Sequence, residues 1–388
     1  MHVLVTDGEQ RAALAAVRSL GRAGHTVTVT SSRRGSVAGS SRFAARELRV
    51  AEPATHPDEY ARNIAAIVRH HDIAVVLPIT DESLLALLSV RDSVGAPIPF
   101  PSLEQVRAIG DKKRVLDAAA SVGVAVPRQW VVGFGGAPPL DVTFPLVVKP
   151  HRSVVGNTRR ERLRVTYARN HEDLRRRLIA LPADAYPLLL QQRIVGPGVG
   201  VFVLRWDGRT VAAFSHRRLR EKPPSGGVSV YRESIALDPE LLTRTERLLD
   251  AFQWQGVAMV EYKVDQATAT PYLMEINGRL WGSLQLAVDA GVDFPVLLVD
   301  AARGRLPEMP VRYRIGVRSR WFWGDVDQLL SRLSRSRRGL ALPPTVPGRW
   351  RAIGDFMAAS LRPSEEEVFR LDDPMPFVRE SLDWLRRR

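Results

Sequence analysis

The sequence contains no cysteine among its 388 residues. This absence excludes a disulfide framework, a thiolate metal site and a thiol nucleophile. No stretch approaches the roughly 20 consecutive apolar residues of a membrane-spanning helix. The first residues, MHVLVTDGEQ, lack a basic segment followed by a long apolar run, so we expect no secretory signal. These absences fit a cytoplasmic enzyme.

Lysine is scarce, with five lysines among 56 basic residues, although the net charge is +14. A positive charge of this size suggests acidic ligands or surfaces. The few lysines are candidates for a task that arginine performs poorly, such as placing a compact charge against a phosphate. Lys112 and Lys149 are the strongest candidates. A bias in coding composition is the alternative explanation.

Residues 1–110 alternate between apolar strand patterns and amphipathic helix patterns. This alternation predicts a parallel sheet with helices on both faces, and therefore an N-terminal α/β domain. The first turn, TDGEQ, has one glycine, so the G-x-G-x-x-G dinucleotide fingerprint is missing. A nicotinamide oxidoreductase is therefore disfavoured. Substrate contacts are expected at the carboxyl ends of strands, near residues 6–9 and 80–82.

From residue 111 to about 305, strands and hairpins mix with helices, which predicts an α+β domain. The Asp207-Gly208 pair is the strongest local hairpin signal. Residues 306–388 form a basic extension that contains the motif RSRWFWGD. The extension either packs onto the preceding domain, contacts an anionic surface or polymer, or binds nucleic acid. We favour packing, because no known nucleic-acid motif is present.

A pair of acidic residues stands out in the strand patterns AMVEYKV and YLMEINGR. A hairpin centred on Thr268 would place Glu261 opposite Glu275, where like charges repel. A divalent cation would resolve this repulsion, with Asn277 on the same face as a third oxygen ligand. Alternatively, the strands form an exposed edge whose glutamates are solvated beside Lys263 and Arg279.

Two further segments have a functional and a structural interpretation. Lys149 ends an apolar strand and precedes a Ser/Gly/Asn loop whose backbone N–H groups could cover phosphates. The segment FSHRRLREKPPSGG places Arg217, Arg218 and Lys222 before a flexible stretch. It is either a loop that closes over an anionic substrate or a solvated basic hairpin end. We expect the preceding His216 to be structural.

The order of five segments resembles the ATP-grasp superfamily: GDKKRVLDAAASVGVAVP, FPLVVKP, LLLQQRIVG, AMVEYKVD and YLMEINGRLWGSLQLAVDAGVDFP. The similarity covers about residues 1–305 and is strongest to the biotin carboxylase, carbamoyl phosphate synthetase and carboxylate–amine ligase branch. It implies an N-terminal pre-ATP-grasp domain (1–110) and an ATP-grasp domain (111–305) with lobes at 111–190 and 191–305. Residues 306–388 have no counterpart and remain a small extension.

The resemblance also implies roles for individual residues. Lys112 and Lys149 match the two nucleotide-binding lysines, and Gly156 lies in the loop over the phosphates. The segment that would meet adenine comprises Gln191, Gln192, Arg193 and Ile194. Glu261, Glu275 and Asn277 match the magnesium ligands, and Arg279 matches the arginine that holds the reacting carboxylate or acyl phosphate. Many members have a ribose-binding glutamate where this sequence has Gly198, so ribose recognition is unassigned.

The activity implied is a ligase that uses ATP and Mg²⁺, with Mn²⁺ as an alternative metal. A carboxylate would be activated as an acyl phosphate and joined to an amine. A carboxylase or carbamate-forming enzyme of the same superfamily and a non-catalytic ATP-binding regulatory protein are the alternatives. The expected partners are a small-molecule carboxylate and amine, without nucleic acid. A homodimer is consistent with the resemblance.

Overall fold

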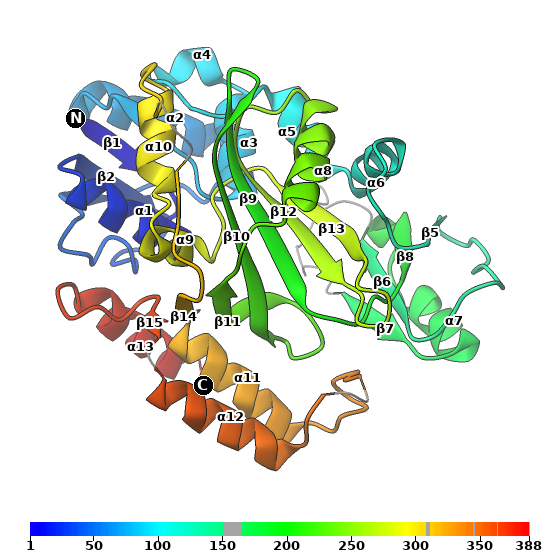
Figure 1. The fold of residues 1–388 in the computed structure, drawn as a ribbon. Helices are drawn as coiled ribbons and strands as arrows, with labels where there is room; N and C mark the ends of the chain where they lie inside the picture. The colour runs from blue at the N-terminus through cyan, green and yellow to red at the C-terminus, as the bar shows by residue number, and fades with distance from the viewer. Residues whose placement is uncertain (151–164, 308–310, 344–345, 363, 388) are drawn as a thin grey trace.

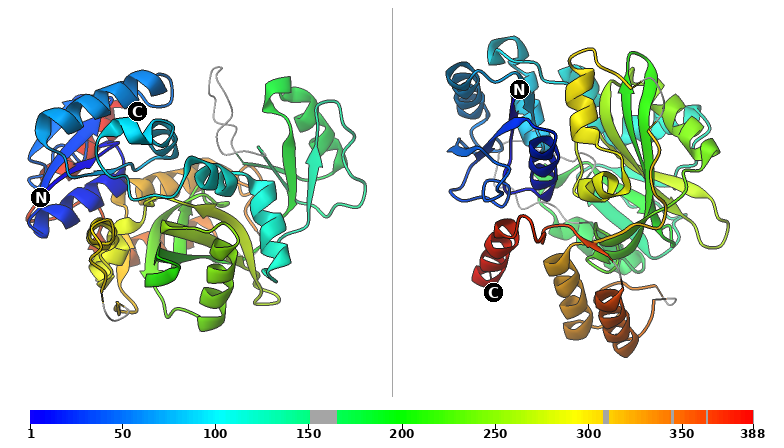
Figure 2. Two further views of the ribbon diagram at one scale, coloured as in Figure 1. Left: turned by 90° about the horizontal axis from the view of Figure 1, so that it is seen from above. Right: turned by 60° about the vertical axis from the view of Figure 1, so that its left-hand side comes forward.

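Three β-sheets organise the computed structural model, which describes residues 1–150, 165–307, 311–343, 346–362 and 364–387 (Figure 1). Helices and strands are mixed within several packed units, so the chain is a multidomain α/β protein, as the sequence predicts. The parallel N-terminal sheet and the small antiparallel sheet lie on opposite sides of the molecule, as two views show (Figures 1 and 2). The largest sheet lies between them and carries most of the site.

The N-terminal sheet is parallel, with strand order β3-β2-β1-β4. Its strands β1 and β2 are almost wholly buried, because helices cover both faces of a parallel sheet. Helix α1 packs its alanine-rich face on this sheet and on later helices. The elements are β1 (His2–Val5), α1 (Arg11–Arg22), β2 (Thr26–Ser31), β3 (Arg46–Arg49), α2 (Pro57–His71), β4 (Val75–Leu77), α3 (Asp81–Leu88) and α4 (Arg91–Val94).

Two consecutive helices, α5 (Leu103–Gly110) and α6 (Lys112–Ser121), connect this region to the rest of the chain. Ser102 and Gln105 form a capping box that begins α5. The Asp111 side chain accepts a hydrogen bond from the backbone N–H of Arg114 and so caps α6. Lys112 is therefore fixed at the first residue of a helix.

The small sheet is antiparallel, with strand order β5-β8-β6-β7. Its apolar side chains form a separate small core with α7. The elements are β5 (Gln129–Val132), β6 (Leu146–Pro150), β7 (Thr166–Ala168), α7 (His171–Ala180), a 3₁₀ turn (Ala183–Ala185) and β8 (Leu188–Gln192). Because β6 and β8 are neighbours, this sheet brings Lys149 beside the segment that begins at Gln191.

The large sheet has the order β13-β12-β9-β10-β11-β14-β15. The hairpin of β9 and β10 turns at Asp207-Gly208, where both residues have positive φ (49° and 75°), as a type I′ turn requires. This hairpin prediction is confirmed. The elements before the extension are β9 (Gly198–Trp206), β10 (Arg209–Lys222), β11 (Val228–Ser234), α8 (Pro239–Asp250), β12 (Gly256–Val264), β13 (Pro271–Asn277), α9 (Leu284–Ala290) and α10 (Phe294–Ala301).

The basic extension packs against the preceding regions, as favoured from the sequence. Its strands β14 (Arg318–Arg320) and β15 (Glu365–Glu366) continue the large sheet. Its helices are α11 (Phe322–Ser334), α12 (Arg349–Leu361) and α13 (Met375–Arg386). Figure 1 shows α11 and α12 packed side by side at one end of the large sheet. Among the described residues, no helix is both long and apolar enough to cross a membrane.

Buried ion pairs join the extension to the first helix of the chain. Arg18 on α1 has no exposed surface, and its Nε donates to Asp373 at 2.8 Å. Asp373 also accepts hydrogen bonds from the Ser41 hydroxyl and from the backbone N–H of Arg42. Glu367 pairs with both Arg11 and the fully buried Arg232 of β11. The two ends of the sequence therefore share one polar core.

Candidate active site

A cavity of about 420 Å³ lies between the small sheet and the large sheet. Strands β6, β7 and β8 supply one wall, and strands β10, β12 and β13 supply the other. The structure brings together around this cavity most of the residues selected from the sequence. They are Lys112, Lys149, Gln191, Gln192, Arg193, Ile194, Arg218, Glu261, Glu275, Asn277 and Arg279.

The two glutamates are direct cross-strand partners, as predicted from the hairpin geometry. Burial raises the pKa of Glu261 to about 7, although the adjacent Arg218 guanidinium acts in the opposite direction. Burial also acts to raise the pKa of Glu275. The hydrogen bond from Asn277 and the charges of Lys112 and Lys149 outweigh it, so this pKa is lowered. Of the two carboxylates, Glu261 therefore takes up a proton more readily than Glu275.

Arg218 on β10 is the ion-pair partner of Glu261 in this structure. Its guanidinium pairs with Glu261 at 2.5 Å and with Glu221 at 2.9 Å. Gly198 on β9 provides the space for this arginine, because an added Cβ would lie 2.8 Å from the Arg218 Cδ. The position expected to carry a ribose-binding glutamate therefore accommodates the stem of an arginine.

The two lysines reach the cavity from different elements. Lys149 ends β6 and is buried, and its ammonium donates to the Gln191 side-chain oxygen at 3.0 Å. Burial and the nearby Lys112 lower the pKa of Lys149 to about 8, against the opposing effect of the two glutamates. Burial also lowers the pKa of Lys112, opposed by Glu275. Two positive charges are thus confined in one partly dehydrated space.

The segment 191–194 runs from the end of β8 along the cavity. Gln191 and Ile194 are buried. The Arg193 guanidinium lies over the Tyr167 ring, with Cζ 4.5 Å from the ring centroid, and donates to the Ala341 carbonyl at 2.7 Å. Tyr167 and the apolar side chains of Ile194, Met259 and Met274 give this part of the cavity a surface suited to a flat ring.

Arg279 follows directly after β13 and reaches back to the N-terminal region. Its Nε lies 3.1 Å from the Asp81 carboxylate, and its Nη2 donates to the Asn277 side-chain oxygen at 3.4 Å. Asp81 begins α3, within the segment 80–82 where substrate contacts are expected at a strand end. The sequence carried no signal that would pair Asp81 with Arg279.

The remaining predicted residues lie elsewhere. Arg217 pairs with Glu233 and does not line this cavity. Lys222 pairs with Asp327, lies over the Trp321 ring and lines a different cavity. Gly156 lies outside the described residues. His216 is buried between Phe202 and Phe214, and burial lowers its pKa well below the usual value. A neutral packed imidazole agrees with a structural role.

Comparisons with known proteins agree on one fold. Residues 184–323 match the model of a family described as ATP-grasp in the biosynthetic pathway with Ter operon. No curated protein matches the chain in sequence. The L-amino acid ligase of Bacillus licheniformis superposes with a TM-score of 0.62, at 15% identity over 78% of this chain and 74% of that chain.

Two further solved structures are similar. The N5-carboxyaminoimidazole synthetase of Staphylococcus aureus gives a TM-score of 0.61, with 13% identity over 80% of this chain and 79% of that one. The biotin carboxylase of Campylobacter jejuni, solved as an ATP complex, gives 0.62, with 17% identity over 80% and 73%. Residues 184–323 therefore match an ATP-grasp family, and the fold of most of the chain is similar to that of these solved structures. The family match covers the large sheet and the start of the extension, the part of the fold that supplies both glutamates.

Proposed function

We propose that this protein is an ATP- and Mg²⁺-dependent ligase that activates a carboxylate as an acyl phosphate and joins it to an amine. One observation carries the proposal: a single cavity collects a buried and a half-buried lysine, a cross-strand glutamate pair, a carboxamide and an arginine. This combination matches the charges of a triphosphate, a divalent metal and a carboxylate. The fold and the superfamily match support it at the level of the ligase class.

In this proposal the nucleotide base lies along residues 191–194, against Tyr167. The phosphates extend toward Lys112 and Lys149, whose ammonium groups offset the charge of the triphosphate. The lowered pKa values of both lysines support this assignment, because two confined cations gain most from a polyanion placed between them. Gly156 is proposed to belong to the loop over the phosphates.

The donor set of Glu261, Glu275 and Asn277 fits Mg²⁺, which favours oxygen ligands in proteins. Within the described residues, no group of three or more His, Cys, Asp or Glu side chains forms a metal site. Glu261, Glu275 and Asn277 would hold the metal together with phosphate oxygens. When bound, the metal would neutralise the charge that builds on the β- and γ-phosphates. Arg218, which now pairs with Glu261, would have to share or release that carboxylate.

The chemistry requires positioning rather than a side-chain nucleophile. A carboxylate oxygen would attack the γ-phosphorus, ADP would leave, and the amine would then displace phosphate from the acyl carbon while losing a proton. Arg279 is the proposed catalytic residue, because its planar guanidinium can hold the reacting carboxylate and then the acyl phosphate. Its ion pair with Asp81 supports this role by holding the guanidinium in a fixed orientation.

A second cavity, of about 530 Å³, supports a location for the acid or the amine. Residues at the carboxyl ends of β1, β2 and β4 line it, including Asp7, Ser31 and Thr80, and the extension contributes Trp323 and Trp384. Val228 lines both this cavity and the proposed nucleotide cavity. Under this proposal, residues 1–110 and 306–388 select the substrate, and residues 111–305 bind ATP.

There are two alternative functions, and a specific observation favours the first. The likeness to biotin carboxylase and to N5-carboxyaminoimidazole synthetase favours an ATP-dependent carboxylase or carbamate-forming enzyme as the second candidate. Bicarbonate would then stimulate ATP turnover without any organic acid. A non-catalytic ATP-binding regulatory protein is the third candidate, and tight ATP binding without turnover on any substrate would identify it.

The deciding experiment measures Mg²⁺-dependent ADP and phosphate release over a panel of carboxylic acids, amines and bicarbonate. Release that requires both an acid and an amine supports the ligase. Release that requires bicarbonate alone identifies the carboxylase. If Glu275→Gln turned over ATP as fast as the parent protein, the proposed site would be wrong.

A further inference from the structure

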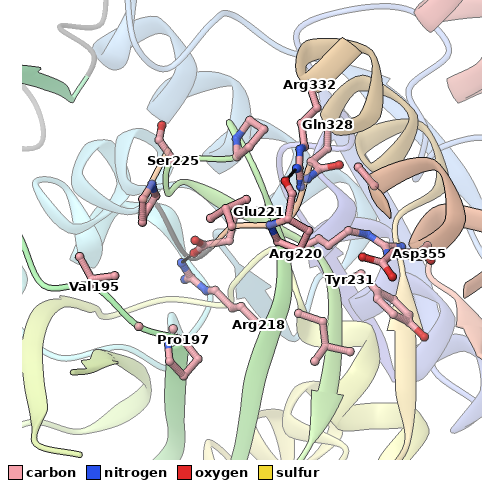
Figure 3. A pocket seen from close by; sticks show the side chains of 18 of the residues that line it. Val195, Pro197, Arg218, Arg220, Glu221, Ser225, Tyr231, Gln328, Arg332 and Asp355 are labelled. Atoms are coloured by element: carbon pink, nitrogen blue, oxygen red, sulfur yellow. Dashed lines mark hydrogen bonds and ion pairs between the residues drawn. The ribbon is translucent and has the colours of Figure 1, made fainter. Parts of the chain in front are cut away.

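A third cavity, of about 570 Å³, lies where the large sheet meets the basic extension. Figure 3 shows side chains from two directions around it: Arg218, Arg220 and Glu221 from β10, and Gln328 and Arg332 from α11. The loop at Val195 and Pro197 closes one side. The volume falls within the roughly 300–1,000 Å³ of small-molecule sites.

The charges around this cavity are strongly unbalanced. Seven basic residues and two acidic residues line it. The basic residues are Arg193, Arg218, Arg220, Lys263, Arg318, Arg332 and Arg362. Three of them are paired with carboxylates: Arg218 with Glu221 and Glu261, Arg220 with Asp325, and Arg318 with Glu233.

The other four cations have no carboxylate within 4.0 Å in the part of the chain that the structure describes. Arg193 donates to the Ala341 carbonyl, and Arg332 donates to the carbonyls of Pro347 and Gly348. Burial lowers the pKa of Arg332, and Arg337 lowers it further against the weaker effect of Asp355. Arg332 is buried, Arg193 and Lys263 are half-buried, and Arg362 is exposed. Because a charge removed from water without a counter-ion is costly, an anion placed among these four groups would be stabilised.

The location separates this cavity from the proposed reaction centre. It shares Arg193, Ile194, Arg218, Glu221, Ser225 and Lys263 with the proposed nucleotide cavity. It contains none of Lys112, Lys149, Glu275, Asn277 and Arg279. An anion bound here would lie beyond the base-binding segment, away from the phosphates, and would contact the extension.

We propose that this cavity, between β10, the 193–198 segment and helices α11 and α12, binds a small molecule that carries at least two phosphate or carboxylate groups. Two unpaired cations come from the wall shared with the nucleotide cavity (Arg193 and Lys263) and two from the extension (Arg332 and Arg362). A ligand that bridges both walls therefore needs at least two anionic groups. The volume of about 570 Å³ matches a small molecule rather than a polymer.

The test is isothermal titration calorimetry of the full chain with inorganic pyrophosphate and, separately, with citrate, in Mg²⁺-free buffer. The two probes distinguish phosphate from carboxylate as the preferred group. Each probe is titrated into the parent protein and into three variants: Lys149→Met, the double variant Arg332→Gln/Arg362→Gln, and Arg351→Gln. Arg351 is exposed on α12 and does not line the cavity, so its variant is a matched control for the loss of positive charge.

We expect saturable binding of at least one probe that survives in Lys149→Met and in Arg351→Gln. In the Arg332→Gln/Arg362→Gln variant the affinity should fall about tenfold or more, because two charged contacts are lost. The Lys149→Met background separates this site from the nucleotide cavity. A failure of the proposed ligase function therefore leaves the test intact.

Three outcomes would overturn the proposal. The first is that neither probe binds saturably. The second is that binding disappears in Lys149→Met and is unchanged in the double variant. The third is that Arg351→Gln weakens binding as much as the double variant does. If the double variant unfolds because Arg332 no longer holds the 347–348 carbonyls, Arg362→Gln alone replaces it. That residue has no bond to lose within the described chain, and its substitution should weaken binding about threefold. An unchanged affinity would then overturn the proposal.

Discussion

Glu261 and Glu275 face each other across β12 and β13, yet their carboxylates have opposite pKa shifts. Arg218 pairs with the first, and Asn277 donates to the second. The pair is therefore held together by neighbours on either side, although burial raises the cost of two adjacent negative charges. This asymmetry makes Glu275 the more reliably ionised ligand for a cation.

Glu275→Gln should reduce Mg²⁺-dependent ATP turnover by at least about 100-fold, because a fixed charge is removed from the transition state. Titration calorimetry of Mn²⁺ with an ATP analogue should show a parallel loss of metal affinity. Glu240→Gln is the control, since Glu240 is an exposed residue of α8 that pairs with Arg244. Equal loss in both variants would contradict the assigned role.

Lys149 should make nucleotide binding depend on pH. Its pKa of about 8 means that the side chain is mostly a charged ammonium below pH 8 and loses its proton and its charge above it. Because the charged form binds phosphate, affinity for an ATP analogue should be constant near pH 7. It should then fall up to about tenfold for each pH unit above 8. Equilibrium binding between pH 7 and 9.5 measures this slope.

Lys149→Met should flatten that pH profile and weaken binding throughout. Lys113→Met should leave the profile unchanged, because Lys113 is exposed and pairs with Asp117 on the surface of α6. If the slope persisted in Lys149→Met, another group would be responsible for it.

Arg279→Lys should retain affinity for the ATP analogue but lower kcat by about 100-fold or more, because lysine cannot supply the planar, two-point contact of a guanidinium. Steady-state kinetics with the acid and amine that give turnover would measure kcat. Arg244→Lys on α8 provides a surface control. A change in KM alone would assign Arg279 to substrate binding instead.

Asp373→Ala should destabilise the protein by about 3–5 kcal/mol, because it leaves the fully buried Arg18 without its counter-ion. The neighbouring Asp372 pairs with Arg22 on the surface, so Asp372→Ala should cost less than about 1 kcal/mol. Urea unfolding of both variants gives the comparison. Similar losses of unfolding free energy in both variants would show that the buried Arg18–Asp373 pair contributes no more to stability than the surface pair.

Local sequence patterns predicted the parts of the site that lie within one hairpin. The two-residue alternation on β12 and β13 predicts Glu261 opposite Glu275, and the structure pairs them, although a register shift between Glu261 and Tyr262 separates this pair from the pairing next to the turn. Likewise, Asp207-Gly208 set the turn between β9 and β10. Such features depend on φ, ψ and the two-residue strand repeat, which neighbouring residues encode.

Contacts between distant segments were not predictable in the same way. The Asp81–Arg279 and Arg218–Glu261 pairs depend on how separate elements dock, and no periodicity links their positions. The same holds for Arg217 and Lys222, which adjoin Arg218 and Glu221 in sequence but pair elsewhere. A register shift in the pairing of β10 with β11 after Arg218 alters the side-chain alternation there.

The pairing of Arg18 with Asp373 has a consequence for biosynthesis. Residues 1–77 emerge from the ribosome long before residue 373 is made, so the first sheet forms while its most deeply placed arginine still lacks a neutralising acid. Domains generally fold in the order of synthesis. Here Arg18 acquires its carboxylate partner only when residue 373 arrives, so the packing of α1 against the extension is completed late in synthesis.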